Sequence, residues 1–272
     1  MFKHLYMKTL SLGPKEHNYG FFSCCSVILT RIVEFIQLHK SLPDFLDTSI
    51  MFRWYKDQIH ANTDLTFQYF MHYSQTNSII PNTNIQYHWE YQFEDYTKID
   101  YNLICPIVQK YFTPSIEIQN IIRSMENKYK LDYNKLCVLF YRGNDKNRET
   151  KICGYDEYVH YSNLVLAKHP DTIFLIQSDE TEFIQYFSNL FPTNHIVFQD
   201  EIRHVKKCNS TVDILFRQSN LLFSKYYLAI TIIMAKCNYI VCGSGNCSIW
   251  ILFYRGNSKN LFQNLNGSWI EG

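Results

Sequence analysis

The sequence lacks the short motifs that mark several common classes of enzyme. It contains no GxGxxG, no GxxxxGK(S/T), no HExxH and no GxSxG, so dinucleotide oxidoreduction, P-loop phosphoryl transfer and hydrolase chemistry lose their usual signatures. It also contains no DxD, the carboxylate pair typical of enzymes that hold a diphosphate through a metal ion. No two of its ten histidines stand at metal-ligand spacing beside a third ligand. These absences favour a site that holds no metal.

The sequence also has little net charge and no recognisable export signal. The 26 basic and 25 acidic residues leave a net charge of +1, which is too small to hold nucleic acid by counterion release, so we expect no nucleic-acid partner. Residues 1–20 have neither the continuous apolar core nor the cleavage site of a signal peptide. The nine cysteines form no CxxC and fit buried, reduced thiols better than a disulfide framework. A cytoplasmic location is therefore expected.

The most apolar run of the chain extends from Leu221 to Cys242. Lys225, Lys236 and Asn238 interrupt it, and a helix followed by a strand explains it as well as a membrane span does. We interpret this run as core and expect no transmembrane segment. With 272 residues, 46% of them hydrophobic, the chain is long enough for one large α/β domain or two small ones, and intrinsic disorder is excluded.

The second half of the sequence alternates between short β-branched or aromatic runs and helical patterns. This alternation is typical of βαβ units on a parallel sheet, so we expect a Rossmann-like half. The expected strands are Leu136–Tyr141, Thr172–Gln177, His195–Phe198 and Tyr239–Cys242. The expected helices are Tyr155–Lys168, a segment between Asp179 and Pro192, residues from about Ser219 to Lys236, and residues from about Asn246 to Phe253.

The first half is less regular. A strand ending near Leu12 leads through HNYGFFS to a helix with Ile28, Ile32 and Ile36 on one face, whereas residues 57–101 show no sustained period. A second amphipathic helix runs from Ile118 to Tyr129, and the polar stretch after it predicts a domain junction. We therefore expect an N-terminal domain over residues 1–130 and a C-terminal domain over residues 131–272.

One octapeptide almost recurs within the sequence. FYRGNDKN begins at Phe140 and FYRGNSKN begins at Phe253. A duplicated domain would extend its similarity into the flanking sequence, whereas here one copy ends a predicted strand and the other ends a predicted helix. We interpret the repeat as a local coincidence.

Polar residues follow the expected strands at the edge where open α/β sheets bind their ligands. The first strand is followed by cations suited to a diphosphate, Arg142, Lys146 and Arg148, and by two carboxylates able to take a proton, Asp145 and Glu149. A solvated charged turn is the alternative interpretation. After the second strand, Ser178 and Asp179 could hold a ribose or base, or could cap the helix that follows.

The fourth expected strand is followed by a glycine- and serine-rich turn that opens a helix. Its glycines allow a close backbone approach, and the start of the helix offers N–H groups to a phosphate, although such turns also occur for packing alone. Gly20 and Phe21 precede the first long helix and could approach the same ligand from across a cleft. The candidate residues of the turn are Ser244, Gly245, Asn246, Cys247 and Ser248.

The run VLFYRGNDKNRET resembles the first motif of the fucosyltransferase superfamily with a GT-B fold, which includes the core α-1,6-, α-1,2-, protein O- and nodulation fucosyltransferases. That motif is a strand followed by His-x-Arg-Arg or His-x-Arg-Gly and an Asp, often with Lys next, and Arg142, Asp145 and Lys146 match it. Phe140 and Gly143 depart from it at the His and the second Arg. FLIQSDE is similar to the second motif of the family and GSGNCSIWI to the third, in the same order, over roughly residues 135–255.

The resemblance implies an α/β, GT-B-like fold of two Rossmann-like halves facing a cleft, with a nucleotide sugar bound mainly by the C-terminal half. It implies a metal-independent, inverting transferase without a cofactor, using a GDP-sugar, most often GDP-fucose, and a glycan or protein hydroxyl as acceptor. Arg142 would pair with the β-phosphate and Asp179 would hold the nucleoside. Glu149 is the first candidate for the base that deprotonates the acceptor, and Asp145 is the second.

Three other interpretations remain open on the sequence. The enzyme could use another nucleotide sugar, because no residue pattern reads guanine or the sugar. The departures at Phe140 and Gly143 also fit a glycan- or nucleotide-binding protein that has kept the fold and lost catalysis. A Rossmann oxidoreductase is weakened by the missing glycine fingerprint.

Overall fold

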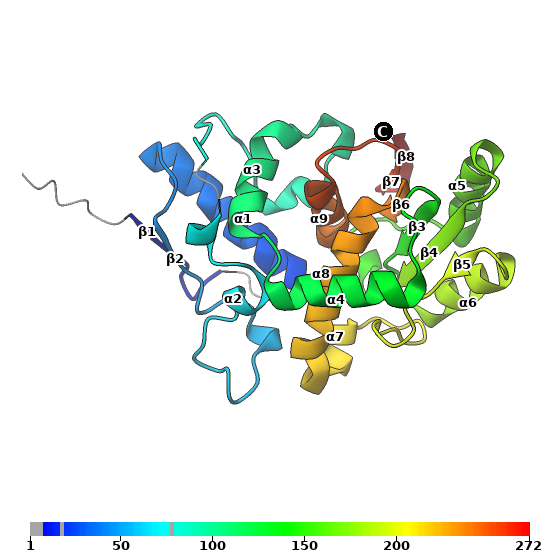
Figure 1. The fold of residues 1–272 in the computed structure, drawn as a ribbon, viewed down its shortest axis with the longest axis horizontal. Helices are drawn as coiled ribbons and strands as arrows, with labels where there is room; N and C mark the ends of the chain where they lie inside the picture. The colour runs from blue at the N-terminus through cyan, green and yellow to red at the C-terminus, as the bar shows by residue number, and fades with distance from the viewer. Residues whose placement is uncertain (1–7, 17–18, 77–78) are drawn as a thin grey trace, which may run out of the picture. The chain divides into compact units, whose positions relative to one another are not determined.

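The computed structural model describes residues 8–16, 19–76 and 79–272, and it forms two compact units (Figure 1). Unit 1 comprises Met1–Tyr91 and Asp100–Glu117, and unit 2 comprises Gln92–Ile99 and Ile118–Gly272. The first seven residues, together with the predicted turn residues His17 and Asn18, lie outside the described residues.

Unit 2 is built on a six-stranded sheet in the order β5-β4-β3-β6-β7-β8. All neighbouring strands are parallel except β7 and β8, which are antiparallel. The predicted parallel sheet is therefore confirmed, and β3 runs over the predicted residues. The strands are β3 (Leu136–Tyr141), β4 (Ile173–Ser178), β5 (His195–Ile196), β6 (Tyr239–Gly243), β7 (Leu261–Leu265) and β8 (Ser268–Glu271).

The hairpin of β7 and β8 was not predicted. Its two-residue loop, Asn266-Gly267, has positive φ at both residues, 51° and 84°, as a tight hairpin turn requires. Asn-Gly is the usual sequence for that turn, so the signal was present in the sequence. The flanking strands LFQNL and SWIE contain too many polar residues to stand out as strands.

Helices connect the strands of this sheet, and their predicted positions are confirmed with small shifts at the ends. α8 is apolar around most of its circumference and packs with α9, whose Trp250 is fully buried. Such a helix belongs to a core rather than to a surface. The helices are α4 (Ile116–Tyr129), α5 (Tyr155–Lys168), α6 (Thr181–Leu190), α7 (Val212–Leu215), α8 (Asn220–Lys236) and α9 (Asn246–Arg255).

The helix α4 belongs mainly to unit 2. The boundary between the two units therefore lies near the start of α4, whereas the sequence predicted a junction after residue 130. Its buried face carries Ile118 and Met125. Its Glu126 carboxylate accepts hydrogen bonds from Tyr133 Oη at 2.5 Å and from Lys236 Nζ, at the end of α8, at 2.8 Å. The periodicity of a helix shows that it has an apolar face but not which neighbour covers that face.

The two copies of the octapeptide have different structures, which confirms that their similarity is local. The first copy ends the strand β3. The second ends the helix α9, where Gly256 takes a left-handed conformation with φ 77°. Arg255 there donates to the carbonyl oxygens of Cys237, Asn238 and Lys259, so this arginine holds backbone in place.

Unit 1 contains one βαβ unit, in which β1 (Thr9–Ser11) pairs in parallel with β2 (Phe45–Asp47) and α1 (Phe21–His39) is the crossover. The predicted helix face is buried, with Ile28, Ile32 and Ile36 at most 1% exposed. By length and composition α1 could cross a membrane, but 72% of its most apolar window is buried inside the fold. A core helix meets the same criteria.

The stretch without periodicity folds through aromatic packing and short helices. Rings from distant positions, such as Phe21 and Tyr69 with centroids 4.8 Å apart, meet edge to face, and an irregular backbone leaves no repeating pattern in the sequence. The helices there are η1 (Arg53–Tyr55), α2 (Thr66–Tyr69), η2 (Tyr73–Gln75), η3 (Trp89–Phe93), η4 (Tyr96–Lys98) and α3 (Tyr101–Tyr111).

Candidate active site

The carboxyl ends of three adjacent strands bring the predicted loops of unit 2 together. Tyr141 pairs with Ser178 at the ends of β3 and β4, and Phe140 pairs with Cys242 of β6 on the other side. The residues that follow these strands therefore share one edge of the sheet, where ligands of such sheets bind. The topology confirms the proximity that the order of strands and helices predicted.

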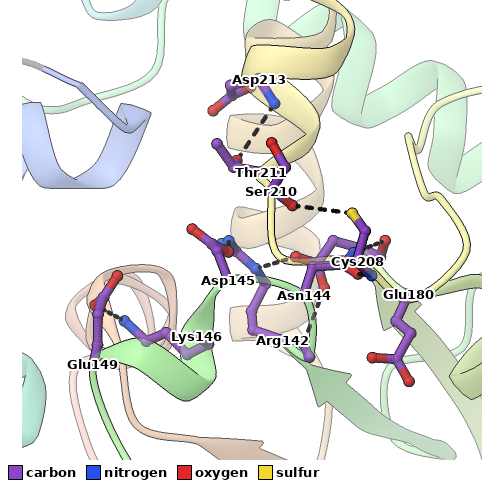
Figure 2. Close-up of polar contacts among 12 residues, drawn as sticks. Arg142, Asn144, Asp145, Lys146, Glu149, Glu180, Cys208, Ser210, Thr211 and Asp213 are labelled. Atoms are coloured by element: carbon purple, nitrogen blue, oxygen red, sulfur yellow. Dashed lines mark hydrogen bonds and ion pairs between the residues drawn. The ribbon is translucent and has the colours of Figure 1, made fainter.

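Arg142 is held by two carboxylates at this edge (Figure 2). Its Nε donates to Asp179 Oδ2 at 2.8 Å, and its Nη2 donates to Asp145 Oδ1 at 3.0 Å. Burial alone would lower the pKa of the guanidinium, but the carboxylates of Asp179 and Asp145 raise it well above its ordinary value. A guanidinium has five N–H donors, and 29% of this side chain is exposed, so Arg142 can still bind an anion.

Asp179 positions Arg142 through both of its oxygens. Its Oδ1 accepts from the backbone N–H of Gly143 at 3.2 Å while its Oδ2 accepts from Arg142. In the structure this side chain fixes the guanidinium at the strand end. The role in holding the nucleoside, which the resemblance implies, stays a prediction.

Asn144 was missed by the sequence analysis, although it ties the first loop to the chain around Cys208. Its Nδ2 donates to the carbonyl oxygen of Asp179 at 2.7 Å, and its Oδ1 accepts from the backbone N–H of Cys208 at 2.8 Å. The side chain is 1% exposed. A buried amide with both ends bonded fixes two loops against each other.

Lys146 is a buried cation in the 3₁₀ helix η5 (Lys146–Arg148). Its Nζ lies 2.5 Å from Glu149 Oε2 and 5.0 Å from the centroid of the Phe93 ring. Burial lowers the pKa of this ammonium, and the Glu149 carboxylate only partly opposes that effect. A buried ammonium of this kind gains stability when an anion approaches it.

The start of α9 lies against Lys146. A Cβ atom at Gly245, the residue before the helix, would be 2.9 Å from Lys146 Cε, so only glycine allows this approach without a shift. No side chain of the N-cap residue, Gly245, caps α9, and the N-terminus of a helix has a partial positive charge.

The Cys247 thiol lies in the first turn of α9. Burial raises its pKa to about 11, and the side chains of Thr231 and Tyr227 oppose that rise more than the Arg142 and Lys146 cations do. Two cations and a positive helix end form an anion site.

The serine hydroxyls of the predicted motifs hold the loops together. Ser178 Oγ accepts from the backbone N–H of Glu180, the N-cap residue of α6, at 3.0 Å. It does not cap the helix, because α6 has no side-chain cap. Ser244 Oγ donates to the carbonyl oxygen of Asn264 at 2.9 Å, and Ser248 Oγ donates to that of Gly243 at 2.5 Å. The three hydroxyls therefore stabilise the loops through contacts with the backbone. The turn before α9 would contact a ligand through its backbone groups.

The remaining predicted residues lie in different settings. Arg148 is exposed on η5, and Asn246 is half-buried in the first turn of α9. Gly20 and Phe21 belong to unit 1, where Gly20 is the N-cap of α1. The Phe21 ring is 1% exposed and packs among the aromatic side chains of that unit, so it has the contacts of a core residue.

The two candidate bases are both ion-paired. The Glu149 side chain is 45% exposed beside Lys146, and the Asp145 side chain is 26% exposed beside Arg142. The predicted alternative for Glu149, a pair with a neighbouring lysine, is thus present. Its exposure still leaves it accessible to an acceptor.

A pocket adjoins this edge, with about 530 Å³ of empty space that includes its opening to solvent. Its wall includes Arg142, Ser178 and Asp179 and several residues that carry no sequence motif. Arg203 Nη2 pairs with Asp213 Oδ1 at 2.6 Å, and its guanidinium lies 5.1 Å from the Phe223 ring centroid. The newly found lining residues include Gln177, Ile202, Arg203, Asp213, Phe223 and Tyr227.

Within residues 8–16, 19–76 and 79–272, no group of three or more His, Cys, Asp or Glu side chains is placed to hold a metal ion. The site consists of paired cations, carboxylates and backbone N–H groups. Those groups can bind a diphosphate and stabilise charge that develops on it.

Comparison with models of protein families gives no match, and a search of curated proteins gives none either. Among solved structures, the chain is similar to the NodZ α-1,6-fucosyltransferase soaked with GDP-fucose, with a TM-score of 0.39 and 9% identity over 61% of this chain and 52% of that one. It is also similar to NodZ co-crystallised with GDP and to NodZ from Bradyrhizobium, each with a TM-score of 0.38 and 10% identity over 61% of this chain and 50% of that one. This chain spans about half the length of those structures.

Gly143, which stands where the fucosyltransferase motif has its second arginine, has no space for a side chain. A Cβ atom there would be 2.1 Å from Glu180 Oε2 and 2.5 Å from Tyr141 Cε1. We expect Gly143→Ala to lower the free energy of unfolding by about 1–3 kcal/mol, because overpacking forces both side chains to move. Gly243→Ala, whose Cβ would meet nothing closer than Tyr158 Oη at 3.9 Å, is the matched control. Equal urea midpoints for the two variants would refute this explanation.

Proposed function

We propose that this chain is a glycosyltransferase that binds a nucleoside-diphosphate sugar at the carboxyl edge of the unit 2 sheet. The observation that carries the proposal is the grouping of Arg142, Lys146 and the start of α9 at the carboxyl ends of three adjacent strands. These groups would bind the diphosphate, since cations and a helix N-terminus together form a binding site for anionic oxygens. The three sequence motifs support the same assignment.

Arg142 would carry the main electrostatic part of the reaction. As the bond between the sugar and the diphosphate breaks, negative charge grows on the leaving phosphate, and a fixed guanidinium stabilises that charge. The pair with Asp179 holds the guanidinium in place before the donor arrives. Little reorganisation is then needed during the reaction.

Donor binding would also change the partner of Glu149. In the structure Lys146 pairs with Glu149 at 2.5 Å. A diphosphate at the start of α9 would compete for the same ammonium and release the carboxylate. Glu149 would then take the proton of the acceptor hydroxyl, while the acceptor oxygen bonds to the sugar carbon and the nucleoside diphosphate leaves with the bonding electron pair.

The finer assignment follows the motifs. The donor would be a GDP-sugar, GDP-fucose first, the acceptor would be a glycan or protein hydroxyl, and the transfer would invert the anomeric centre without a metal ion. Another nucleotide sugar is the alternative within this class. A non-catalytic binding protein is the alternative outside it, favoured by the pairing of both candidate bases with cations. A hydrolysis and transfer assay over a panel of sugar nucleotides separates these possibilities.

The first functional prediction concerns Arg142. Arg142→Ala should weaken binding of the donor by roughly 10- to 100-fold, because a hydrogen-bonded charge pair with a phosphate is lost, and should abolish transfer. Arg142→Lys should restore only part of the activity, since an ammonium cannot bind two oxygens as a guanidinium fork does. Calorimetry with GDP and a transfer assay measure both effects.

Two controls accompany this prediction. Removing Arg142 leaves Asp179 buried without its cation, so the double variant Arg142→Ala/Asp179→Asn separates loss of binding from loss of stability. Arg255→Ala removes an arginine whose contacts are backbone carbonyls, and should lower stability without changing the affinity for GDP. If Arg142→Ala and the double variant both bound GDP with wild-type affinity, Arg142 would not be a residue that binds the diphosphate.

The second prediction separates binding from chemistry. Glu149→Gln keeps the shape of the side chain but removes the base, so donor binding should persist while single-turnover transfer falls by on the order of 10²- to 10⁴-fold. Asp145→Asn is measured beside it. A collapse of transfer in the Asp145 variant alone would make Asp145 the base, and full rates in both would exclude both carboxylates.

The third prediction is that catalysis needs no divalent metal. It follows from the absence of a DxD motif and from the two cations, Arg142 and Lys146, that would serve the diphosphate in place of a metal ion. Transfer should continue at an unchanged rate in excess EDTA. Activity lost in EDTA and restored by manganese or magnesium would contradict this mechanism.

A further inference from the structure

The chain between β5 and the first turns of α8 carries most of the positive charge excess of the protein. Residues 202–225, here called the basic segment, contain a single acidic residue, Asp213. The whole chain has a net charge of only +1, so the remainder of the chain is net acidic. A local excess of this kind favours association with an anionic partner. The basic residues of the segment are Arg203, Lys206, Lys207, Arg217 and Lys225.

The same segment exposes a group of large apolar side chains. Ile214 and Leu215, at the end of α7, are each 50% exposed, and the adjacent Phe216 is 40% exposed. Leu222, in the first turn of α8, is 53% exposed. We call these four side chains the apolar tip. In Figure 1, α7 and the start of α8 project below the other helices of unit 2. Single exposed apolar residues are ordinary, but four so close together form a patch.

Arg203 fixes the conformation of the basic segment from the inside. Its side chain is 9% exposed, and it donates to Asp213 Oδ1 and to Asn220 Oδ1, each at 2.6 Å. It also donates to the carbonyl oxygen of Phe216 at 3.3 Å. Asn220 Nδ2 in turn donates to the carbonyl oxygen of Asp213 at 2.9 Å, which joins α7 to the start of α8. The polar groups of the segment therefore bond inward, while the apolar tip is held exposed on an ordered structure.

Charge and size favour a lipid surface over a second copy of the chain. Arg203 neutralises the Asp213 carboxylate, whereas Lys206, Lys207 and Arg217 are exposed. In a two-fold dimer this patch would face itself and bring like charges together. Four half-exposed side chains also offer well under the roughly 800 Å² that each partner buries in a stable interface. An anionic bilayer accepts both features, because apolar side chains enter between the lipids and cations meet the headgroups.

We propose that the basic segment docks on the surface of an anionic lipid bilayer, with the apolar tip inserted among the headgroups and the exposed cations against the lipid phosphates and carboxylates. Such binding is peripheral, because α7 has only four residues and a membrane span needs about 20. The inference does not depend on the proposed function. Thr211 and Val212 of the segment line the pocket beside Arg142, so docking would place that pocket near the lipid surface.

Flotation of the whole chain with lipid vesicles tests this surface. The vesicles consist of phosphatidylcholine alone or of phosphatidylcholine with about 30% phosphatidylserine, whose headgroup adds the negative charge. We expect the chain to bind the vesicles that contain phosphatidylserine at low salt. Binding should weaken at high salt, because ions screen exposed charges, and should be slight on phosphatidylcholine alone.

Two variants separate the apolar and the electrostatic parts of the binding. Ile214→Ser/Leu215→Ser should lower partitioning onto the anionic vesicles by about tenfold, because two apolar side chains no longer insert. Lys206→Gln/Lys207→Gln/Arg217→Gln should lower it by about 100-fold, because three cations no longer meet the charged surface. The second variant should also lose most of the dependence on salt.

Matched controls make the same kinds of change outside the basic segment. Ile116→Ser/Leu190→Ser alters two apolar residues that are 61% and 42% exposed. Lys15→Gln/Lys168→Gln/Lys259→Gln removes three exposed cations and lowers the net charge by the same amount. Both controls should bind the anionic vesicles as the wild type does.

Each of the other outcomes would overturn the proposal. No binding of the wild type to anionic vesicles, or equal losses in the segment variants and in their controls, would exclude a docking surface here. The substituted side chains are exposed, so all variants should melt as the wild type does. A lower melting temperature for Ile214→Ser/Leu215→Ser alone would show that the tip is packed within the chain in solution. Self-association of the wild type that this variant abolishes would assign the tip to a second copy.

Discussion

The ion pair of Arg142 with Asp179 is the interaction on which the site depends. It joins the ends of two neighbouring parallel strands, and it keeps a cation charged where burial would otherwise oppose the charge. Lys146, on the same loop, then lies against the start of α9. A sheet edge with two cations and the N-terminus of a helix attracts a ligand with at least two negative charges.

Holding these charges without a ligand requires internal counterions. Asp145 and Glu149 supply them, each three residues from a cation along the same loop. The same carboxylates are the candidates for the base. Under the proposed function, a donor would take over the cation and release the paired carboxylate, so donor binding would make a base available.

The C-terminal half was predictable because the hydrophobic residues of its strands and helices repeat with a clear period and residues such as proline mark where the helices end. β3 and α5 have the predicted residues, and the parallel sheet was predicted, although the order of its strands was not. The first half was not, because packing among rings such as Phe21 and Tyr69 has no sequence period. Within the site, the loop residues were found from their position after strands. Their partners were not: Asn144 and Arg203 act through contacts with distant segments.

The central claim is that a diphosphate binds between Arg142, Lys146 and the first turn of α9, and a crystal structure of the chain with bound GDP tests it most directly. The account predicts phosphate oxygens within hydrogen-bond distance of the Arg142 guanidinium and of backbone N–H groups at the start of α9. It also predicts that Lys146 contacts phosphate and has separated from Glu149. A nucleotide bound away from this edge, or an intact pair of Lys146 and Glu149 beside a bound diphosphate, would contradict it.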